Sequence, residues 1–435
     1  MPASPAIMSN LFRCSNVKQA NIKRLREVSS VEPRTFVEKV TPDLFLLRVD
    51  DTRIKFFEGM WEIPEGITYN AYLLATGEGA VLFDGWKREY AELLLSSLES
   101  IVDIRSVKFA VVHHAEPDHS GSAPVLAEKA PHAVFLGHPI AGRILKSHYR
   151  VERFRPVKDG EALQLGGRTL RFIYAPWLHW PDTIFTFVEE EGVLLSCDVF
   201  GGYSTPSLFD DEADLEALAR AVRKYAVTVV GHYSEWIAKG LEKLKTAGIN
   251  PKIIAPAHGP VYRSNPHWAI ERWAEISSGA AKRGKTALVY VSMYGNVDRL
   301  FHALEERLRG RGLEVAVHAF TDKQRSLASE VLTDVSDAEL LILGVPVYEA
   351  SVHPLMIHLA RLIGEKLPSR KQIPILLLSS YGWGPASRKL AEILQSYGFT
   401  NLHIIDFEGS AGAELLAKVD SLLSEAHAKL AGGGA

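Results

Sequence analysis

The last third of the chain repeats one pattern so regularly that it leaves little choice of fold. From residue 286 onward, short apolar runs alternate with segments in which apolar residues recur every three or four positions. Such runs are typical of buried strands, and such segments of amphipathic helices. Five strand and helix pairs in succession predict a doubly wound parallel sheet that binds ligands beyond the carboxyl ends of its strands. The expected strands lie at 286–292, 313–320, 339–348, 373–380 and 401–407.

The chain before this repeat has a different organisation. Between residues 40 and 255 the sequence predicts short strands separated by turns, and helical periodicity appears at 90–101 and from about 211 to 247. Two hairpins are expected, one joining 68–76 to 79–85 and the other joining 184–188 to 193–197.

A break separates the two organisations. The segment SSGAAKRGK at 277–285 is small, polar and glycine-containing, which predicts a domain boundary. We therefore expect an amino-terminal extension over 1–33, one domain at 34–280 and a second at 284–430.

The composition is that of a globular protein and disfavours several partners. Hydrophobic residues make up 47% and charged residues 23% of the 435 residues. A formal net charge of −3 provides no basic field for nucleic acid. The sequence has neither the roughly 20-residue apolar run of a membrane span nor a signal peptide. Cys14 and Cys197 cannot form a disulfide framework, so a cytoplasmic location is expected.

The stretch HHAEPDHSGS at 113–122 carries the strongest chemical signal. It follows the strand-like run KFAVV and contains His114, Glu116, Asp118 and His119 within six residues. Imidazole nitrogens and carboxylate oxygens on one tight loop suit a divalent transition metal. Taken by itself, the stretch would also fit a solvated polar loop whose histidines bond to the local backbone.

Three further candidate ligands each stand just beyond an expected strand, beside glycine or proline. They are His179 in WLHWPDT, Asp198 in CDVFGG and His258 in APAHGP. Functional side chains often project from a rigid sheet at such places. A single histidine or aspartate at a strand end is usually structural, whereas four such places in one domain favour a shared metal site.

The order of these residues resembles that of the flavodiiron proteins, whose amino-terminal domain has the metallo-β-lactamase fold. The resemblance rests on His-x-Glu-x-Asp-His followed by His, Asp and His, and on the phrases TYNAYLL, LHWPD, CDVFG and PAHGP. It extends from about residue 40 to the carboxyl-terminal helix. It implies an αββα sandwich followed by a flavodoxin-like sheet, in an oxidoreductase that reduces dioxygen to water, nitric oxide to nitrous oxide, or both.

The resemblance also implies a non-haem di-iron site built from the candidates above. On this reading His114, Glu116 and His179 bind one iron, Asp118 and His258 bind the other, and Asp198 bridges the two. His119 belongs to the same candidate set, although related proteins differ in whether this histidine binds iron directly.

Three neighbouring residues refine this interpretation. Hydrolases of the same fold carry histidine where this chain has Glu116, and the added carboxylate favours iron over zinc. His113 has no role in the family pattern and is interpreted as structural. Cys197 is interpreted as a buried packing residue.

Three loops in the carboxyl-terminal part predict an FMN site. They follow the first, third and fourth expected strands, and the first opens a helix whose backbone N–H groups can hold a phosphate. Family members commonly have threonine at Val297, so one phosphate contact is missing here. No G-x-G-x-x-G follows the first strand, which favours FMN over a dinucleotide. The expected FMN-binding residues are Ser292, Met293, Tyr294, Gly295, Asn296, Val297, Pro346, Val347, Tyr348, Glu349, Ser380, Tyr381, Gly382, Trp383 and Gly384.

The presence of both predicted cofactors in one chain has a chemical reason. A di-iron centre and a reduced flavin together store the four electrons that reduce dioxygen to two waters. Two alternatives are a dinuclear zinc hydrolase with a flavodoxin-like appendage and a non-catalytic FMN electron carrier. Without a CxxC pair or a further domain, the chain is expected to need a separate donor: a rubredoxin, a reduced deazaflavin or another reductase. The resemblance further implies a head-to-tail homodimer or homotetramer.

Overall fold

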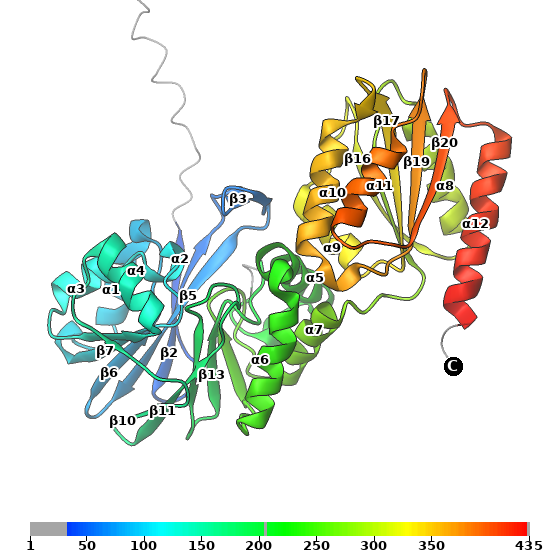
Figure 1. Cartoon of the computed structure of the whole chain (residues 1–435). Coiled ribbons are helices and arrows are strands. Elements are labelled where there is room, and N and C mark those ends of the chain that lie inside the picture. Colours follow the sequence, from blue (N-terminus) through cyan, green and yellow to red (C-terminus); the bar gives the residue numbers. More distant parts are fainter. Residues whose placement is uncertain (1–32, 204–206, 433–435) are drawn as a thin grey trace, which may run out of the picture. The chain divides into compact units, whose positions relative to one another are not determined.

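The computed structural model describes residues 33–203 and 207–432, in which three main sheets organise the chain (Figure 1). The residues from Arg34 onward form one compact unit. Apart from Pro33, the expected amino-terminal extension lies outside the described residues, as does Cys14.

Two of the sheets pack face to face. Their facing side chains, among them Leu46, Leu74, Leu170 and Leu195, share one buried apolar cluster. The first sheet has the order β1 (Arg34–Lys39), β2 (Leu44–Asp51), β5 (Ile67–Thr76), β6 (Gly79–Phe83), β7 (Val107–Val112), β8 (Val134–Gly137) and β9 (Phe154–Pro156). The second has the order β10 (Ala162–Leu165), β11 (Arg168–Tyr174), β12 (Ile184–Val188), β13 (Val193–Cys197) and β14 (Ile253–Pro256).

Helices cover the outer faces of both sheets and complete an αββα sandwich, as expected. The helices α1 (Ala91–Glu99), α3 (Ala123–Lys129) and α4 (Pro139–Tyr149) lie on the first sheet, and α6 (Ser234–Thr246) and α7 (Pro266–Ser278) lie on the second. Both expected hairpins are present, because β5 pairs antiparallel with β6 and β12 with β13.

The helical periodicity expected from about 211 to 247 is interrupted in the structure. Helix α5 (Leu215–Tyr225) runs into a π-helical turn at Ala226–Val230 and a 3₁₀ turn at Gly231–Tyr233 before α6 begins. Single π turns inside helices are often found at functional sites, because they change the direction of the flanking side chains. This one directly follows Tyr225, whose contact with Asp198 is described below.

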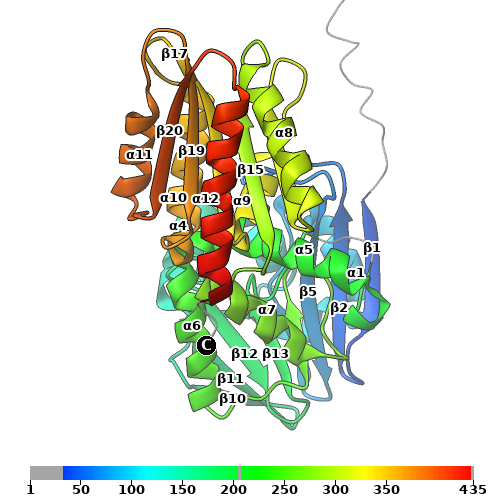
Figure 2. The same cartoon turned by 90° about the vertical axis from the view of Figure 1, so that its right-hand side faces the viewer.

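The third sheet is parallel and doubly wound, as the sequence predicts. Its order is β16 (Glu314–Phe320), β15 (Lys285–Val291), β17 (Leu340–Tyr348), β19 (Ile375–Tyr381) and β20 (Leu402–Glu408). Helices α8 (Asn296–Gly310) and α12 (Ala413–Gly432) cover one face, and α9 (Ala328–Ser336), α10 (Pro354–Lys366) and α11 (Ser387–Ser396) cover the other (Figure 2). The short strand β18 (Ser351–Val352), which pairs with β17, was not expected. None of the helices in the described part of the chain has the length and apolar character needed to cross a membrane.

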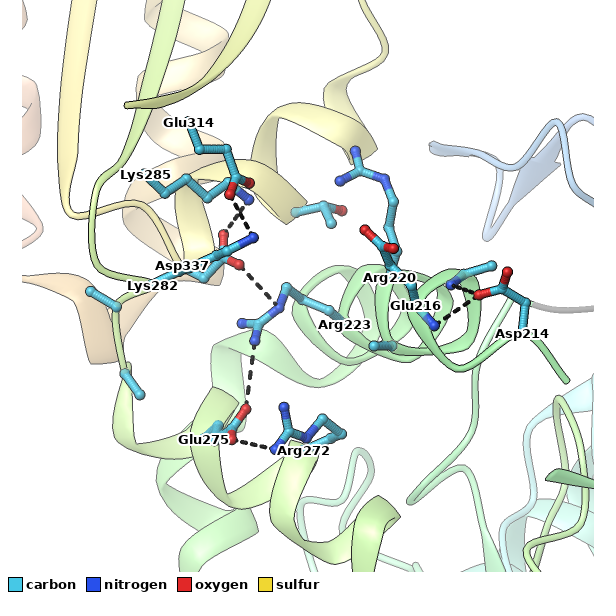
Figure 3. A pocket seen from close by; sticks show the side chains of 15 residues that line it. Asp214, Glu216, Arg220, Arg223, Arg272, Glu275, Lys282, Lys285, Glu314 and Asp337 are labelled. Atoms are coloured by element: carbon cyan, nitrogen blue, oxygen red, sulfur yellow. Dashed lines mark hydrogen bonds and ion pairs between the residues drawn. The ribbon is translucent and has the colours of Figure 1, made fainter. Parts of the chain in front are cut away.

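Charged side chains join the sandwich to the third sheet at the amino-terminal ends of its strands. Arg220 on α5 bonds to Asp334 at 2.9 Å, and Lys224 bonds to Glu330 at 2.8 Å. At the first residue of β15, the ammonium of Lys285 lies 2.9 Å from Asp334. The same charged region surrounds a cavity of about 810 Å³ between α5, α7 and the start of β15, in which cationic and anionic side chains are paired with one another (Figure 3).

Replacing Asp334 by asparagine tests how strongly this contact holds the fold. Burial raises the pKa of the Asp334 carboxyl, but His318, Arg220 and Lys285 outweigh burial and hold this pKa below its ordinary value of 3.8. A carboxyl with a depressed pKa stabilises the fold above its unfolded pKa, and this stabilisation is lost as the pH falls. The variant should lose about 3 kcal/mol of unfolding free energy at neutral pH, measured by urea denaturation. The loss should shrink below pH 3.8, and an equal loss at about pH 3 would contradict this assignment.

Candidate metal centre and cofactor loops

The seven candidate ligands meet at one edge of the sandwich, where strands of both sheets end. They come from the loop after β7 and the short helix α2 (Pro117–Ser120), and from the loops after β11, β13 and β14. Six of the seven are buried and Glu116 is half-buried. Trp177, Cys197 and Phe200, which flank two of these ligands, have positive φ angles of 66°, 50° and 70°. Strained backbone of this kind persists where the surrounding structure holds a functional geometry.

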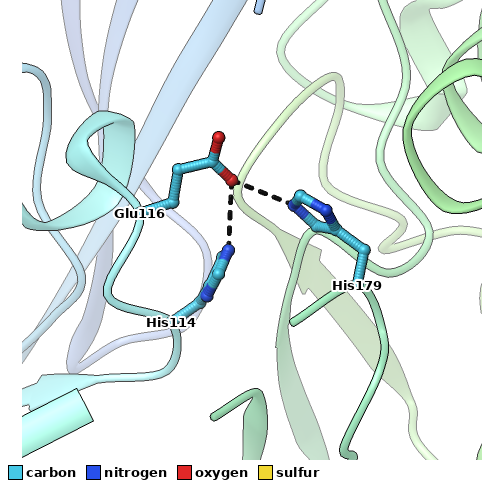
Figure 4. A group of neighbouring side chains, drawn as sticks. All are labelled: His114, Glu116 and His179. Atoms are coloured by element: carbon cyan, nitrogen blue, oxygen red, sulfur yellow. Dashed lines mark hydrogen bonds and ion pairs between the residues drawn. The ribbon is translucent and has the colours of Figure 1, made fainter. Parts of the chain in front are cut away.

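The first group consists of His114, Glu116 and His179 (Figure 4). One carboxylate oxygen of Glu116, Oε2, lies 3.1 Å from Nε2 of His114 and 3.0 Å from Nε2 of His179. Two imidazole nitrogens and a carboxylate oxygen therefore converge on one point, as they do around a transition metal ion.

The second group consists of Asp118, His119 and His258. Nε2 of His258 lies 3.4 Å from Oδ2 of Asp118, and Nε2 of His119 lies 3.4 Å from Oδ1 of the same carboxylate. Its three ligand atoms are close enough to share a second metal ion.

Asp198 lies between the two groups and turns one oxygen to each. Its Oδ2 is 3.8 Å from the Nε2 atoms of both His114 and His179. Its Oδ1 is 3.1 Å from Nε2 of His119 and 3.3 Å from that of His258. This is the geometry that a bridging carboxylate requires.

Several polar atoms of these groups are buried without a hydrogen-bond partner. They are both carboxylate oxygens of Asp118 and the Nε2 atoms of His179 and His258. An unsatisfied buried polar atom destabilises a protein, so native proteins seldom leave several together. A pair of metal ions would satisfy both imidazole nitrogens and at least one oxygen of Asp118, and the residues therefore fit a dinuclear metal site.

The electrostatics of the cluster also favour cations. Burial lowers the pKa of the His119 imidazole, but the Asp118 and Asp198 carboxylates outweigh burial and raise this pKa to about 10. Burial likewise lowers the pKa of His114, while Asp182 and Glu116 raise it well above its ordinary value. Without metal, the carboxylates thus draw protons onto the imidazoles. Metal ions would supply the same positive charge.

Three hydrogen-bond partners of the ligands were missed by the sequence analysis. Asp182 lies 3.2 Å from Nδ1 of His114 and accepts a bond from the backbone N–H of Ala115. Nδ1 of His258 donates to the backbone carbonyl of Thr68 at 2.6 Å. Such partners fix the ring orientation of a metal-binding histidine and leave its other nitrogen facing the metal.

The third missed partner acts on the bridging carboxylate. The hydroxyl of Tyr225 donates to Oδ1 of Asp198 at 2.7 Å. Asp182 could have been suspected from the phrase LHWPD, because it is a buried acid beside a candidate ligand. Nothing local in the sequence marks Tyr225, which lies 27 positions beyond Asp198.

The two residues interpreted as structural have the surroundings that this interpretation requires. The ring of His113 bonds to Asp84 at 2.7 Å and to Thr186 at 2.8 Å, so both of its nitrogens already have partners. The thiol of Cys197 is buried, and burial raises its pKa well above its ordinary value.

The three expected FMN loops follow β15, β17 and β19, which are neighbours in the sheet. Tyr294 and Trp383 in these loops are 89% and 76% exposed, the largest values among the large hydrophobic side chains described. Tyr348 is 37% exposed and is the last residue of β17, directly before the second of these loops. Exposed aromatic rings on adjacent loops fit a planar ligand.

The phosphate end of this expected site also has a suitable conformation. Gly295 has a φ of 84° and caps the fifteen-residue helix α8 without a side-chain hydrogen bond, and the Asp298 N–H in the first turn donates to the Ser292 hydroxyl. The amino terminus of such a helix favours an anion.

Some of the expected FMN-binding residues cannot contact the cofactor with their side chains, because these side chains are buried. Val297 is 1% exposed in the core beneath α8, and Pro346 and Val347 are buried within β17. Any contact that Val297 makes with a phosphate must therefore use its backbone.

Comparison with known proteins agrees with this geometry. The family described as ODP family beta lactamase matches residues 67–259. A nitric oxide reductase of Moorella thermoacetica is 32% identical, over 81% of this chain and 88% of the relative. A rubredoxin-oxygen oxidoreductase of Megalodesulfovibrio gigas is 30% identical, over 83% of this chain and 90% of the relative.

A solved structure gives the same result for the fold. A mutant flavo di-iron protein from Thermotoga maritima matches with a TM-score of 0.84 and 36% identity, covering 91% of this chain and all of the other. The match extends across the sandwich and the parallel sheet, so the fold is a metallo-β-lactamase-like sandwich followed by a flavodoxin-like sheet. The chain belongs to the flavodiiron protein family.

Proposed function

We propose that this flavodiiron protein reduces dioxygen to water, nitric oxide to nitrous oxide, or both, at a non-haem di-iron site that receives electrons through FMN. The observation that carries this proposal is the position of Glu116, whose carboxylate joins His114 and His179. Hydrolases of this fold have a histidine there, and a hard oxygen ligand favours iron. Relatives named nitric oxide reductase and rubredoxin-oxygen oxidoreductase support the same reaction class.

In this proposal the two groups of ligands hold one iron each. The first iron is held by His114, Glu116 and His179, the second by Asp118, His119 and His258, and Asp198 bridges them. When bound, the iron pair and the flavin supply the electrons for the reduction. Because Asp198 offers one oxygen to each group, it sets the separation of the two metal positions.

The remaining side chains keep this arrangement rigid and shielded from water. The Tyr225 hydroxyl holds one oxygen of Asp198, and Asp182 holds His114 in the orientation that turns Nε2 inward. Phe57, which is 5% exposed, packs edge-to-face against His258 with 5.9 Å between the ring centroids and shields that side of the site. A site held in this way needs little reorganisation during the reaction.

In this proposal the three loops that follow β15, β17 and β19 would hold FMN. The start of α8 would bind its phosphate, and the exposed aromatic side chains would contact its ring. Replacing Trp383 by alanine should weaken FMN binding about two- to tenfold, because an aromatic stacking contact contributes about 0.5–1.5 kcal/mol. Fluorescence of released flavin after dilution measures the change. Trp236→Ala, on α6 in the sandwich, serves as the control, and equal flavin release from both variants would contradict the placement.

The proposal includes a head-to-tail homodimer, or a homotetramer made of two such dimers. Within one chain, the contact with the sandwich involves Lys285 at the start of β15, whereas the FMN loops follow its end. The seven residues of β15 span about 20 Å. A second chain that brings its FMN loops to the metal site would remove this separation, and a two-fold arrangement does so for both chains at once.

We place the division between the two domains at residues 280–284 and the protein in the cytoplasm, which is consistent with a buried free thiol at Cys197. A separate protein or cofactor supplies the electrons. A rubredoxin is the first donor to test because of the name of one relative, and a reduced deazaflavin or another reductase are the alternatives.

One experiment tests the function and separates it from its alternatives. The purified protein is analysed for metal, reduced anaerobically, and mixed with dioxygen or nitric oxide in parallel. We expect about two irons per chain and consumption of at least one gas. Zinc together with thioester or lactone hydrolysis would support a hydrolase instead. Bound FMN without any gas consumption would support the alternative that the protein is a non-catalytic electron carrier.

A further inference from the structure

Side chains of strand β5, in the polar stretch Thr68–Tyr72, form hydrogen bonds with the loop that carries His258. The amide of Asn70 donates to the carbonyls of Pro256 and Gly259, both at 2.9 Å. The hydroxyl of Tyr72 also donates to Pro256, at 2.7 Å, and the Thr68 hydroxyl accepts from the Gly259 N–H. These three side chains lie on one face of the strand, because alternate residues of a strand point the same way.

Tyr69 lies on the opposite face and is the one polar side chain of this stretch without such a role. It is fully buried, and its hydroxyl has no hydrogen-bond partner. Its ring meets the ring of His258 edge-on, with 5.6 Å between the centroids. Helix α2, which carries Asp118, packs against β5. A buried phenol therefore stands beside the second group of ligands with its hydroxyl unused.

Among the residues that the structure describes, the carboxylate of Asp118 lacks a hydrogen-bond donor, just as the Tyr69 hydroxyl lacks an acceptor. His114, His258 and Asp198 each have an outer partner, as described above, whereas neither oxygen of Asp118 has a hydrogen-bond partner in the described residues. A metal ion would occupy one of these oxygens. The other would remain a buried acceptor that needs a donor.

We propose that Tyr69 is a positioning residue of the metal site, whose hydroxyl donates to the Asp118 oxygen that does not bind metal. The inference rests on the proposed di-iron function. It would give Asp118 an outer partner equivalent to the one that Tyr225 gives Asp198. A phenol keeps its proton at neutral pH, so the Tyr69 hydroxyl can act as a donor.

The variant Tyr69→Phe tests this with two measurements that should change in opposite directions. In the metal-free protein, the melting temperature should stay the same or rise, because the variant removes an unsatisfied buried hydroxyl. In the iron-loaded protein, iron retention against a chelator should fall about 10- to 100-fold, the usual effect of losing an outer partner of a ligand. A residue whose only role is to pack in the core would not combine an unchanged or higher melting temperature with weaker iron retention.

Two control variants separate this result from other causes. Tyr174→Phe removes a hydroxyl that donates to the carbonyl of Val157, so it should lower the melting temperature and leave iron retention unchanged. Lys87 lies over the Tyr69 ring at 4.8 Å, and Lys87→Met removes this cation while it keeps the Tyr69 hydroxyl.

The outcomes are distinct. Unchanged iron retention in Tyr69→Phe would overturn the inference, as would a loss seen only in Lys87→Met. If the unaltered protein binds zinc and no iron, the proposed function fails, yet zinc retention by Tyr69→Phe still tests the bond to Asp118.

Discussion

Replacing Asp198 by alanine should give a protein that purifies with far less than one iron per chain, against about two in the unaltered protein. The reason is geometric. Asp198 turns Oδ2 to His114 and His179 and Oδ1 to His119 and His258, so the variant removes a ligand atom from both metal positions at once. Metal analysis normalised to bound FMN measures the effect, because the FMN loops lie on another sheet.

Matched variants make this prediction specific to a bridge. Asp118→Ala removes a carboxylate from the second group only and should leave about one iron per chain, in a two-metal site whose positions fill separately. Tyr225→Phe keeps the carboxylate and removes only the donor to Oδ1, so its iron loss should be smaller. If Asp198→Ala retains as much iron as Asp118→Ala, Asp198 is a terminal ligand.

The second large effect is expected when two inactive variants are mixed. One lacks ligands, with His114→Ala and Glu116→Ala, and the other lacks FMN through Gly295→Asp. The new carboxylate of the second variant stands at the start of α8, where the helix favours an anion. It would therefore compete with the FMN phosphate for this position. In a head-to-tail dimer, each mixed pair contains one complete combination of flavin and metal site. Subunit exchange should restore about half the native activity per mixed dimer.

This result depends on which chain delivers the electrons. Exchange is verified by a mass difference between tagged subunits, and each variant alone supplies the baseline. Mixed dimers that remain inactive after verified exchange would show that electrons pass within a single chain. The contact of α5 with α9 would then have to open, because it holds the amino-terminal edge of the sheet.

Much of the fold and most of the ligand positions follow from local patterns. The alternation after residue 286 predicts the parallel sheet, because each buried strand and each amphipathic helix has its own period. The candidates His114, His179, Asp198 and His258 could be selected because each follows a strand. The side chains at one edge of a sheet are brought together by the fold itself.

Other details are decided by packing and are not visible in the local pattern. The periodicity from about 211 to 247 predicts helical structure, and α5 and α6 form there. The apolar pattern does not reveal the π turn at Ala226–Val230 between them. Val297 was expected among the FMN residues from its place in a loop. Its side chain is part of the core under α8, because an apolar residue in the first turn of a packed helix points inward. The predicted contact with FMN therefore depends on the Val297 backbone.

The sequence by itself determined the two kinds of sheet, the set of candidate ligands and the three loops, because these depend on residue type and short spacing. Only the tertiary structure decided which ligands share a group, that Asp198 faces both, and that Tyr225 and Thr68 hold the site from outside. Tyr69 could not be selected from its place in β5 either, since its neighbours on the strand face the other way. The physical reason is that an outer partner is defined by which buried polar atom lacks a bond, and that is known only when every chain segment is packed.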